Sequence, residues 1–215
     1  MKLDLSGRSA LVTGSTAGIG FAAAKALAEC GARVFVNGRD EARTAEAAGR
    51  IAAGAQPVAG DVGTAQGCKA IHAATGPVDI LVNNAGIFEP ADFFDTDDET
   101  WDRHWQVNVM SAVRLSRAYA PAMVDKGWGR IVMLGSESAF NIPAEMIHYG
   151  VSKTADVAFA RGLAKRLAGS GVTVNSVLPG PTLSEGLEDM LADRAAQSDK
   201  PLEEVAADFV MENRP

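Results

Sequence analysis

A tyrosine and a lysine stand four residues apart in the stretch HYGVSK, as Tyr149 and Lys153. On a helix, this spacing places both side chains on one face. A tyrosine with an ordinary pKa near 10 is a weak acid and a poor base at neutral pH, and a nearby ammonium group stabilises its phenolate. The pair could therefore exchange a proton with a substrate oxygen. An ordinary amphipathic pair is the alternative interpretation.

A glycine-rich segment, TGSTAGIG, runs from Thr13 to Gly20 between an apolar run and the start of a helical pattern. Its glycines allow a tight turn and a close approach of the backbone to a pyrophosphate, and the start of a helix offers unpaired N–H groups to the anion. The segment predicts a nucleotide site, with a structural glycine turn as the alternative. Cofactor contacts are expected from six of its residues: Gly14, Ser15, Thr16, Gly18, Ile19 and Gly20.

Later strand ends carry residues that fit the same nucleotide. The second strand ends in NGRD, where Gly38 stands in place of an acidic residue that would bind a ribose 2′-hydroxyl, and Arg39 could bind a 2′-phosphate. NADP(H) is therefore favoured over NAD(H), with a solvated Arg39 as the alternative, and Asp40 is expected to cap the next helix. Further cofactor contacts are expected at the next two strand ends, with turn chemistry as the alternative: Asp61, Val62, Asn83, Ala85 and Gly86.

Short apolar runs alternate with helical patterns along the chain. Strands are predicted over 9–14, 32–38, 56–62, 78–86, 130–136 and 172–180. Helices are predicted over 19–30, 41–53, 64–75, 98–126, 149–167 and within 184–214. Runs that are apolar throughout indicate a parallel sheet covered on both faces. The sequence predicts an α/β protein with a three-layer, doubly wound Rossmann fold of at least six parallel strands. It is expected to form a single domain over residues 1–215, with ligands at the carboxyl ends of the strands.

Composition excludes several classes of protein. The 215 residues carry a net charge of −7, and the pI of about 5.0 argues against nucleic acid or an anionic membrane as a partner. No apolar run is long enough for a membrane span, and the N-terminus has no signal core. Cys30 and Cys68 form no disulfide framework and lack metal-ligand spacing, so no metal is expected. A cytoplasmic location is predicted.

Together these motifs resemble the short-chain dehydrogenase/reductase family. The resemblance rests on TGSTAGIG, on NNAG at 83–86, on a serine thirteen residues before a Tyr-x-x-x-Lys motif and on PG after the sixth strand. It implies an NAD(P)-dependent oxidoreductase that interconverts a ketone or aldehyde with an alcohol, a small-molecule substrate, by hydride transfer. It also implies a catalytic tetrad of Asn108, Ser136, Tyr149 and Lys153.

The family gives each member of the tetrad a role. Tyr149 acts as general acid/base, Lys153 lowers its pKa and Ser136 polarises the substrate oxygen. Asn108 holds a water that links Lys153 to solvent, and a buried helix asparagine bonded to backbone is the alternative. Ser138 competes with Ser136, which has the better spacing.

The stretch LPGPTL after the sixth strand is assigned by the resemblance to the nicotinamide end of the cofactor. Contacts are expected from Pro179, Gly180 and Thr182, with Ser184 as an alternative to Thr182. Residues 184–214 are implied to be a helical lid over the substrate, and a plain packing helix is an equally good explanation. Further candidates to line the pocket are Glu137, Ile142, Met146, His148, Leu187, Met190 and Leu191. A surface position is favoured for His148 over a catalytic one.

The chain departs from the family at its C-terminal end. Members usually continue with a helix and a seventh strand, whereas this sequence ends at Pro215, so the sheet is predicted to lack that strand and to expose an edge. The family implies a homodimer or homotetramer through the 98–126 and 149–167 helices. A non-catalytic nucleotide-binding regulator or scaffold is the competing function, against which the complete Ser136, Tyr149 and Lys153 set argues. A nucleotide-sugar epimerase fits the glycine spacing less well.

Overall fold

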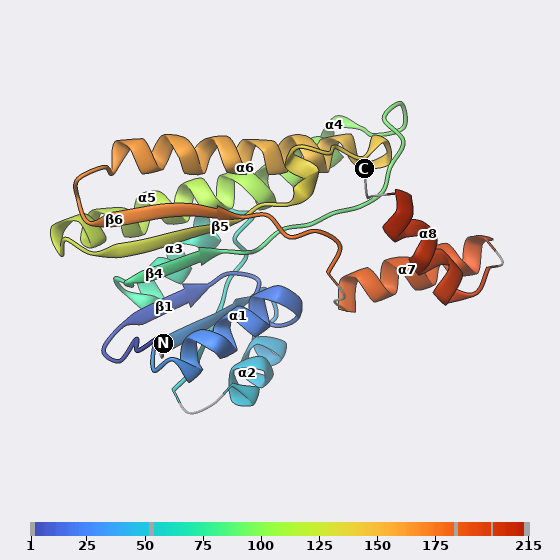
Figure 1. Ribbon diagram of the computed structural model, residues 1–215. Coiled ribbons are helices and arrows are strands. Elements are labelled where there is room, and N and C mark those ends of the chain that lie inside the picture. Colours follow the sequence, from blue (N-terminus) through green and yellow to red (C-terminus); the bar gives the residue numbers. More distant parts are fainter. Residues whose placement is uncertain (1–2, 52–53, 183–184, 199, 213–215) are drawn as a thin grey trace.

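Six parallel strands form one sheet in the order β3-β2-β1-β4-β5-β6 (Figure 1). The computed structural model describes residues 3–51, 54–182, 185–198 and 200–212. The strands are β1 (Ser9–Val12), β2 (Arg33–Gly38), β3 (Gln56–Ala59), β4 (Ile80–Asn83), β5 (Gly129–Leu134) and β6 (Val172–Val177). All neighbouring strands pair in parallel, and the order reverses between β1 and β4. The predicted doubly wound fold is confirmed, and its ligand crevice is expected at this reversal.

Helices cover the two faces of the sheet (Figure 1). Helices α1 (Gly18–Glu29) and α2 (Glu41–Arg50) pack on one face, and α3 (Ala65–Thr75), α5 (Ser111–Asp125) and α6 (Ile147–Arg166) pack on the other. The core therefore has two parts, because successive side chains of a strand point to opposite faces. Ala10 and Val12 of β1 face α1 and α2, whereas Leu11 faces the other group of helices.

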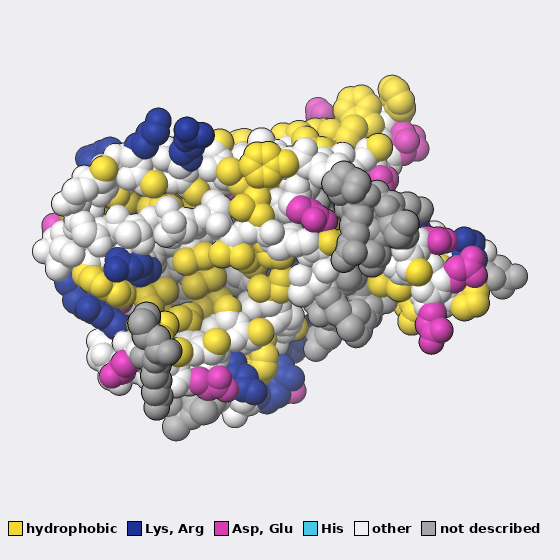
Figure 2. Space-filling view, in the orientation of Figure 1, with side chains coloured by type: hydrophobic (Ala, Val, Ile, Leu, Met, Phe, Trp, Pro, Cys, Tyr) yellow, Lys and Arg dark blue, Asp and Glu magenta, His cyan; other side chains and the backbone are white. Residues whose placement is uncertain are grey.

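Strands β5 and β6 are covered less evenly than predicted. Ile131 and Met133 of β5 are buried against α5 and α6, but Val132 between them is only half-buried. In β6, Thr173 and Asn175 are exposed. Figure 2 shows hydrophobic side chains gathered in the middle of the view, between β6 and α1. The prediction that every strand is covered on both faces is therefore wrong for β6, because α1 and α2 pack over the other half of the sheet.

The predicted 98–126 helix changes its winding in the middle. It consists of α4 (Asp98–His104), a π-helical segment η1 (Trp105–Met110) and α5. A π-helix adds a residue to each turn and occurs mostly at functional sites. The apolar spacing predicted one helix, and the segment WQVNVM contains neither proline nor glycine to signal the change.

The C-terminal segment forms two helices, α7 (Glu185–Ser198) and α8 (Leu202–Glu212), which lie beyond the carboxyl ends of the strands (Figure 1). They pack on each other through Leu191, Val205 and Phe209. Residues 184, 199 and 213–214 of the predicted lid lie outside the described part. Among the helices of the ranges given above, none is long and apolar enough to cross a membrane.

Candidate active site

Two neighbouring hollows lie at the carboxyl edge of the sheet. The first, of about 340 Å³, is bounded by the start of α1, the residues that follow β4, β5 and β6, and the face of α6. The second, of about 240 Å³, lies at the ends of β2 and β3. Asn84 and Gly86 line both hollows, so the two form one elongated site. This shape suits a dinucleotide bound across the reversal of strand order.

The glycine-rich turn from β1 into α1 forms the floor between the hollows. Gly14 and Gly18 have φ values of 59° and 55°, in the left-handed region that favours glycine. A Cβ atom built on Gly14 would lie 2.9 Å from the Cα atom of Ala85, and one on Gly20 would lie 2.3 Å from Nδ2 of Asn84. The turn therefore packs so closely against the end of β4 that side chains cannot replace these glycines without movement.

The start of α1 fits an anion. Its N-cap residue, Ala17, supplies no side-chain hydrogen bond, so the first N–H groups of the helix are left for another acceptor. Gly18, Ile19 and Gly20 line the first hollow at this point. A phosphate placed there would receive these N–H groups together with the positive end of the helix dipole.

Buried polar side chains hold the turn from below. Oγ of Ser15 donates to the carbonyl of Val12 at 2.7 Å and accepts the N–H of Asn37 at 3.0 Å. Oδ1 of Asn37 accepts the N–H of Gly14 at 3.3 Å, and its Nδ2 donates to the carbonyl of Val58 at 3.0 Å. Ser15, expected to bind the cofactor, thus shapes the turn and lines neither hollow. Asn37 is missing from the predicted set, although a polar residue in the apolar run VFVNG was a usable signal.

The two asparagines of NNAG lie in different places. Nδ2 of Asn84 donates to the carbonyls of Thr13 at 2.8 Å and Gly14 at 2.9 Å, which ties the end of β4 to the glycine turn. Asn83 points into the core, where its Nδ2 donates to Oγ of Ser116 at 3.3 Å. The structure therefore does not bring the side chain of Asn83 into either hollow.

The second hollow collects the residues predicted for the adenosine side. A Cβ atom on Gly38 would lie 2.5 Å from Cγ2 of Thr16 and 2.6 Å from Oγ1 of Thr44, so an acidic side chain has no room there. Asp40 caps α2 as predicted, because its Oδ1 accepts the N–H of Arg43 at 2.8 Å. The predicted residues that line this hollow are Gly14, Thr16, Arg39, Asp61, Val62, Ala85 and Gly86.

Tyr149 and Lys153 lie on the face of α6 that borders the first hollow. Lys153 is buried, and its Nζ lies 5.9 Å from the centre of the Tyr149 ring. The ammonium group donates to the carbonyl of Leu134 at 2.9 Å and to Oδ2 of Asp156 at 3.3 Å. A Cβ atom on Gly86 would lie 3.3 Å from Nζ. The lysine therefore extends from α6 across the end of β5 towards the end of β4.

Ser136 lies two residues after the end of β5 and lines the first hollow, as does Ser138. Oγ of Ser136 accepts the N–H of Ser138 at 3.1 Å, which leaves its own O–H free to donate. The N–H of Glu137 donates to the carbonyl of Pro179 at 3.0 Å and holds this turn against the segment after β6. The three residues predicted for the nicotinamide end, Pro179, Gly180 and Thr182, line the same hollow.

Asn108 lies in the π-helical segment and is buried. Its Oδ1 accepts the N–H of Ile87 at 2.8 Å, and its Nδ2 donates to the carbonyl of Ile87 at 3.0 Å and to Oγ of Ser152 at 2.9 Å. Oγ of Ser152 donates in turn to the carbonyl of Tyr149 at 2.7 Å. Asn108 therefore links the segment after β4 to the first turn of α6, in agreement with the backbone-bonded alternative.

The substrate side of the first hollow is mostly apolar. Phe88, Met146, Met190 and Phe209 line it together with Glu137, and the rings of Phe88 and Tyr149 lie 6.2 Å apart. Of the other candidates for this wall, Ile142 and Leu191 do not line it. Ile142 is exposed, Leu191 packs between α7 and α8, and the side chain of Leu187 lies outside the described residues.

The expectation that His148 lies at the surface is wrong. Its ring is buried 4.3 Å from that of His104 and 6.0 Å from that of Trp101, measured between ring centres. A nitrogen of the ring, Nε2, lies 3.1 Å from the carbonyl oxygen of Glu89. His148 therefore packs α4 and the segment after β4 against the start of α6, beside Tyr149. The sequence did not reveal this because His104 is remote along the chain.

Comparison with known proteins agrees with the geometry. A family model described as short chain dehydrogenase matches residues 8–195. The protein named Uncharacterized oxidoreductase YvaG of Bacillus subtilis (strain 168) is 46% identical over 224 residues, which span 100% of this chain and 83% of that protein. The D-beta-hydroxybutyrate dehydrogenase of Cupriavidus necator is 36% identical over 220 residues, with 98% and 84% covered.

A solved structure extends the similarity to three dimensions. L-sorbose reductase from Gluconobacter frateurii, complexed with NADPH and L-sorbose, superposes with a TM-score of 0.93 at 30% identity, over 100% of this chain and 85% of that one. The sequence match, the six-stranded parallel sheet and the site at its carboxyl edge lead to one conclusion. This chain belongs to the short-chain dehydrogenase family of oxidoreductases.

Proposed function

We propose that the protein is an NADP(H)-preferring oxidoreductase that interconverts a carbonyl compound and an alcohol, with Tyr149 as general acid/base. Family membership supports NAD(P)-dependent oxidoreduction of this class. The observation that carries the finer assignment is the meeting of Tyr149, Lys153 and Ser136 in one hollow with the uncapped start of α1. A purely regulatory nucleotide-binding protein would have no use for a tyrosine and a buried ammonium group at this point.

The residues around both hollows fit a nicotinamide dinucleotide. Three of them would hold its pyrophosphate through backbone N–H groups (Gly18, Ile19, Gly20), and the Pro179–Gly180 turn lies where the nicotinamide would be held. The bound cofactor would supply or accept the hydride. The crowding at Gly38 and the position of Arg39 support a 2′-phosphate rather than a free hydroxyl. The complex of L-sorbose reductase with NADPH is consistent with this preference.

Proton transfer is proposed to run between Tyr149 and the substrate oxygen. In reduction, the phenol O–H gives its proton to the carbonyl oxygen, and the O–H of Ser136 donates a hydrogen bond to the same oxygen. In oxidation, the phenolate takes the alcohol proton. The positive charge of Lys153, 5.9 Å from the centre of the Tyr149 ring, is proposed to stabilise the phenolate by electrostatic attraction.

Asn108 has two proposed contributions. Its contacts with Ile87 and Ser152 hold the segment after β4 against α6. Its Oδ1 and Nζ of Lys153 would lie 3.4 Å and 3.3 Å from a Cβ atom on Gly86, so both atoms face the same place. An amide oxygen can accept a second hydrogen bond, and this arrangement supports the proposed water between Asn108 and Lys153.

Helices α7 and α8 are proposed to act as a lid within a single domain that spans residues 1–215. Met190 of α7 and Phe209 of α8 line the first hollow beside the proposed proton donor. Among the described residues, Glu137 and Lys153 are the only charged side chains that line it. Since Glu137 would repel a carboxylate, a neutral carbonyl substrate is expected to react better than an anionic one.

The test is NADPH oxidation with a panel of neutral and anionic carbonyl compounds. Turnover that depends on one neutral carbonyl, with a slower reaction of its carboxylate analogue, is the expected result. Tight NADPH binding with no turnover of any carbonyl would favour the non-catalytic alternative. Replacing Glu137 by glutamine should narrow the difference between neutral and anionic substrates.

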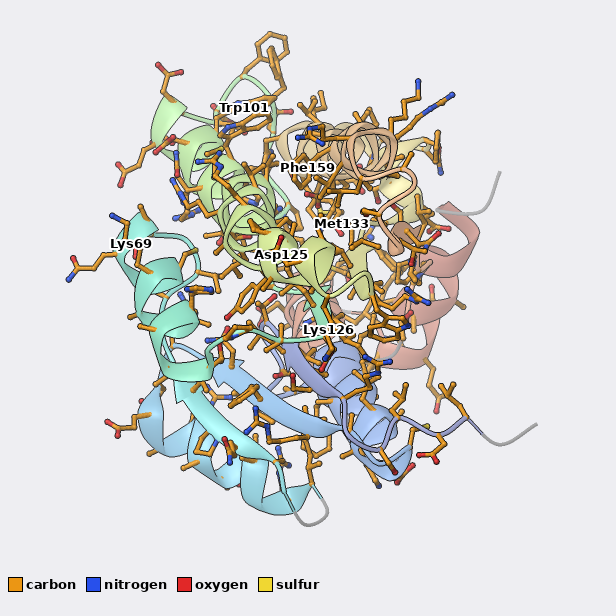
Figure 3. All side chains as sticks on the ribbon, turned by 90° about the vertical axis from the view of Figure 1, so that its left-hand side faces the viewer. Lys69, Trp101, Asp125, Lys126, Met133 and Phe159 are labelled. Carbon is orange, nitrogen blue, oxygen red and sulfur yellow. The ribbon has the colours of Figure 1, made fainter. Side chains whose placement is uncertain are left out.

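The protein is also proposed to form a homodimer or homotetramer through α5 and α6. A groove of about 550 Å³ lies between these helices. Figure 3 shows them side by side, with Phe159 on α6 and Asp125 at the end of α5. The apolar lining supports burial against a second copy: Val113, Ala120, Pro121, Val124, Phe159, Leu163 and Leu167. A cytoplasmic location is part of the same proposal, supported by the free thiols of Cys30 and Cys68.

A further inference from the structure

A buried carboxylate lies beside the ammonium group of Lys153. Asp156 is one turn further along α6, only 3% exposed, and its Oδ2 accepts from Nζ of Lys153 at 3.3 Å. Its other oxygen, Oδ1, is buried and has no hydrogen-bond partner in the described part of the chain. Lys153 is therefore the partner that the structure gives to this carboxylate.

Stability alone does not explain Asp156. Burial raises the pKa of its carboxyl group to about 6, although the charge of Lys153 acts in the opposite direction. Ionisation of Asp156 is thus less favourable in the folded protein than in water, although the group is ionised above about pH 6. An apolar side chain at this position would avoid both the buried charge and the unpaired oxygen. A strained titratable group in direct contact with a candidate site residue indicates a role in that site.

The contacts of Lys153 account for two of the three N–H donors of its ammonium group. An ammonium group has three N–H donors. One bonds to the carbonyl of Leu134 and one to Asp156, so a single donor is left for the side of the hollow that Tyr149 and Gly86 border. The contact with Asp156 fixes the direction of the ammonium group and places a negative charge behind it.

We propose that Asp156 is a positioning residue for the reaction: it holds Lys153 against Leu134 and offsets part of the positive charge that acts on Tyr149. The inference rests on the proposed function, in which the charge of Lys153 stabilises the phenolate of Tyr149. Removing the negative charge should leave the phenolate better stabilised. Alcohol oxidation, which requires the phenolate, should then begin at a lower pH.

Other ionisable groups lie on the elements that pack against α6. Glu137 of η2 (Glu137–Ala139) lines the same hollow as Tyr149. His104 of α4 contacts His148 at the start of α6, and Glu145 lies in η3 (Ala144–Met146) just before it. Arg130 of β5 bonds to the carbonyls of Gly129 and Gly171 at the amino edge of the sheet. The variants described below change none of these groups, so a shift in the pH profile of the reaction reports on Asp156.

The test is the pH profile of kcat/KM for alcohol oxidation, using the alcohol that corresponds to the best carbonyl of the panel. Asp156→Asn keeps the shape of the side chain and removes its charge, and Asp156→Ser removes the charge with a smaller side chain. In each of these two variants, the midpoint of the pH profile should move to lower pH by at least about half a unit. On the acidic limb of the profile, this shift corresponds to a kcat/KM that is higher by about threefold. Asp156→Glu, which keeps the charge, should restore the wild-type midpoint.

Unchanged midpoints in folded variants that still bind NADP would overturn the role of Asp156. If Asp156→Asn does not fold, Asp156→Ser decides the outcome alone, and thermal unfolding identifies the folded variants. Tyr149→Phe is measured in parallel. If it keeps its turnover, the proposed function itself fails. If it loses turnover while the Asp156 variants keep the wild-type midpoint, only the inference about Asp156 fails.

Discussion

Lys153 is the residue at which the contacts of the candidate site converge. Its ammonium group lies between the carbonyl at the end of β5, the carboxylate of Asp156 and the ring of Tyr149. A buried ammonium group keeps its charge only where such partners replace water. The same partners orient it, so the charge acts at a defined position beside the phenol.

Arg39 allows the cofactor preference to be tested at a single residue. Arg39→Ala should weaken NADPH binding by about tenfold or more, because a bond between two charged groups is lost. NADH binding should change little, since NADH lacks the 2′-phosphate. Fluorescence titration with both cofactors measures the two affinities.

Arg161→Ala, at an exposed position on α6, is the matched control. It should leave both affinities unchanged. Equal weakening of NADPH and NADH by Arg39→Ala would contradict the proposed contact with the 2′-phosphate.

The residues that bear chemistry were predictable to different degrees. The spacing of Tyr149 and Lys153 predicted that they share a helix face, and the family resemblance added Ser136; all three line one hollow. Asn37 was missed because its partners Ser15 and Val58 come near only through packing. Asp156 was missed although it stands one helical turn from Lys153. Ser15 and Asn83 were expected at the cofactor but turn inward, where Ser15 bonds to buried backbone and Asn83 bonds to the side chain of Ser116.

At the scale of elements, α4 and α6 meet through two buried histidine rings. Nδ1 of His104 lies 2.9 Å from the carbonyl of Thr100, and its Nε2 is buried without a partner among the described residues. Burial lowers the pKa of His104 below its ordinary value of 6.5, so the folded protein favours the neutral ring. This contact supports the start of α6, where Tyr149 lies.

The burial of His104 in this contact should make the free energy of unfolding depend on pH. The pKa of His104 is lower in the folded chain than in the unfolded chain, so the unfolded chain binds protons more readily. The contribution of His104 to the free energy of unfolding is therefore complete above pH 6.5 and is lost as pH falls below it. Urea unfolding at pH 7.5 and pH 5.5 measures how much free energy of unfolding is lost between the two pH values. His104→Phe, which keeps a ring but cannot take up a proton, should lose less than the wild type.

His72→Phe is the matched control for this measurement, because His72 is half-buried and contacts Tyr119 on another helix. His72→Phe should lose as much free energy of unfolding between pH 7.5 and pH 5.5 as the wild type does. A loss of the same size in His104→Phe would contradict the role given to the buried ring.

The sequence predicted whether each element is a helix or a strand better than it predicted where the elements end or how the helices are wound. The predicted strands extend past the real ones, into residues such as Gly14 and Gly180 that leave the sheet to build the site. The π-helical segment has no signature in its residue types, because its extra residue per turn is held by contacts such as Asn108 with Ile87. Such contacts between segments are invisible to local periodicity.

At the scale of the whole molecule, one sheet edge holds the chemistry and the α5–α6 surface holds the proposed interface. The groove between these helices is mainly apolar, with Arg117, Asp125 and Arg166 also lining it, and Val124 in it is 37% exposed. Apolar surface of this kind is stabilised by burial in an oligomer. The site residues Tyr149 and Lys153 lie in the first two turns of α6, whereas the groove residues of this helix lie in its second half, so self-association at the groove would leave the mouth of the hollow open.

Leu163→Glu places a charge in that groove and should dissociate the oligomer. The expected result is a shift to monomer in size-exclusion chromatography with light scattering, because a charge buried at an interface is strongly unfavourable. Ala22→Glu, at an exposed position on α1, should leave the mass unchanged. A wild-type protein that is monomeric at micromolar concentration would contradict the proposed interface.

The proposed reaction depends most directly on the phenol of Tyr149. Tyr149→Phe removes one oxygen and keeps the ring that packs near Phe88. NADPH affinity should stay within about twofold of the wild type, whereas carbonyl turnover should fall by at least about a hundredfold, as expected for loss of a general acid. Steady-state NADPH oxidation and fluorescence titration on the same preparation measure both values. Near-normal turnover by Tyr149→Phe would contradict the assignment of Tyr149 as the proton donor.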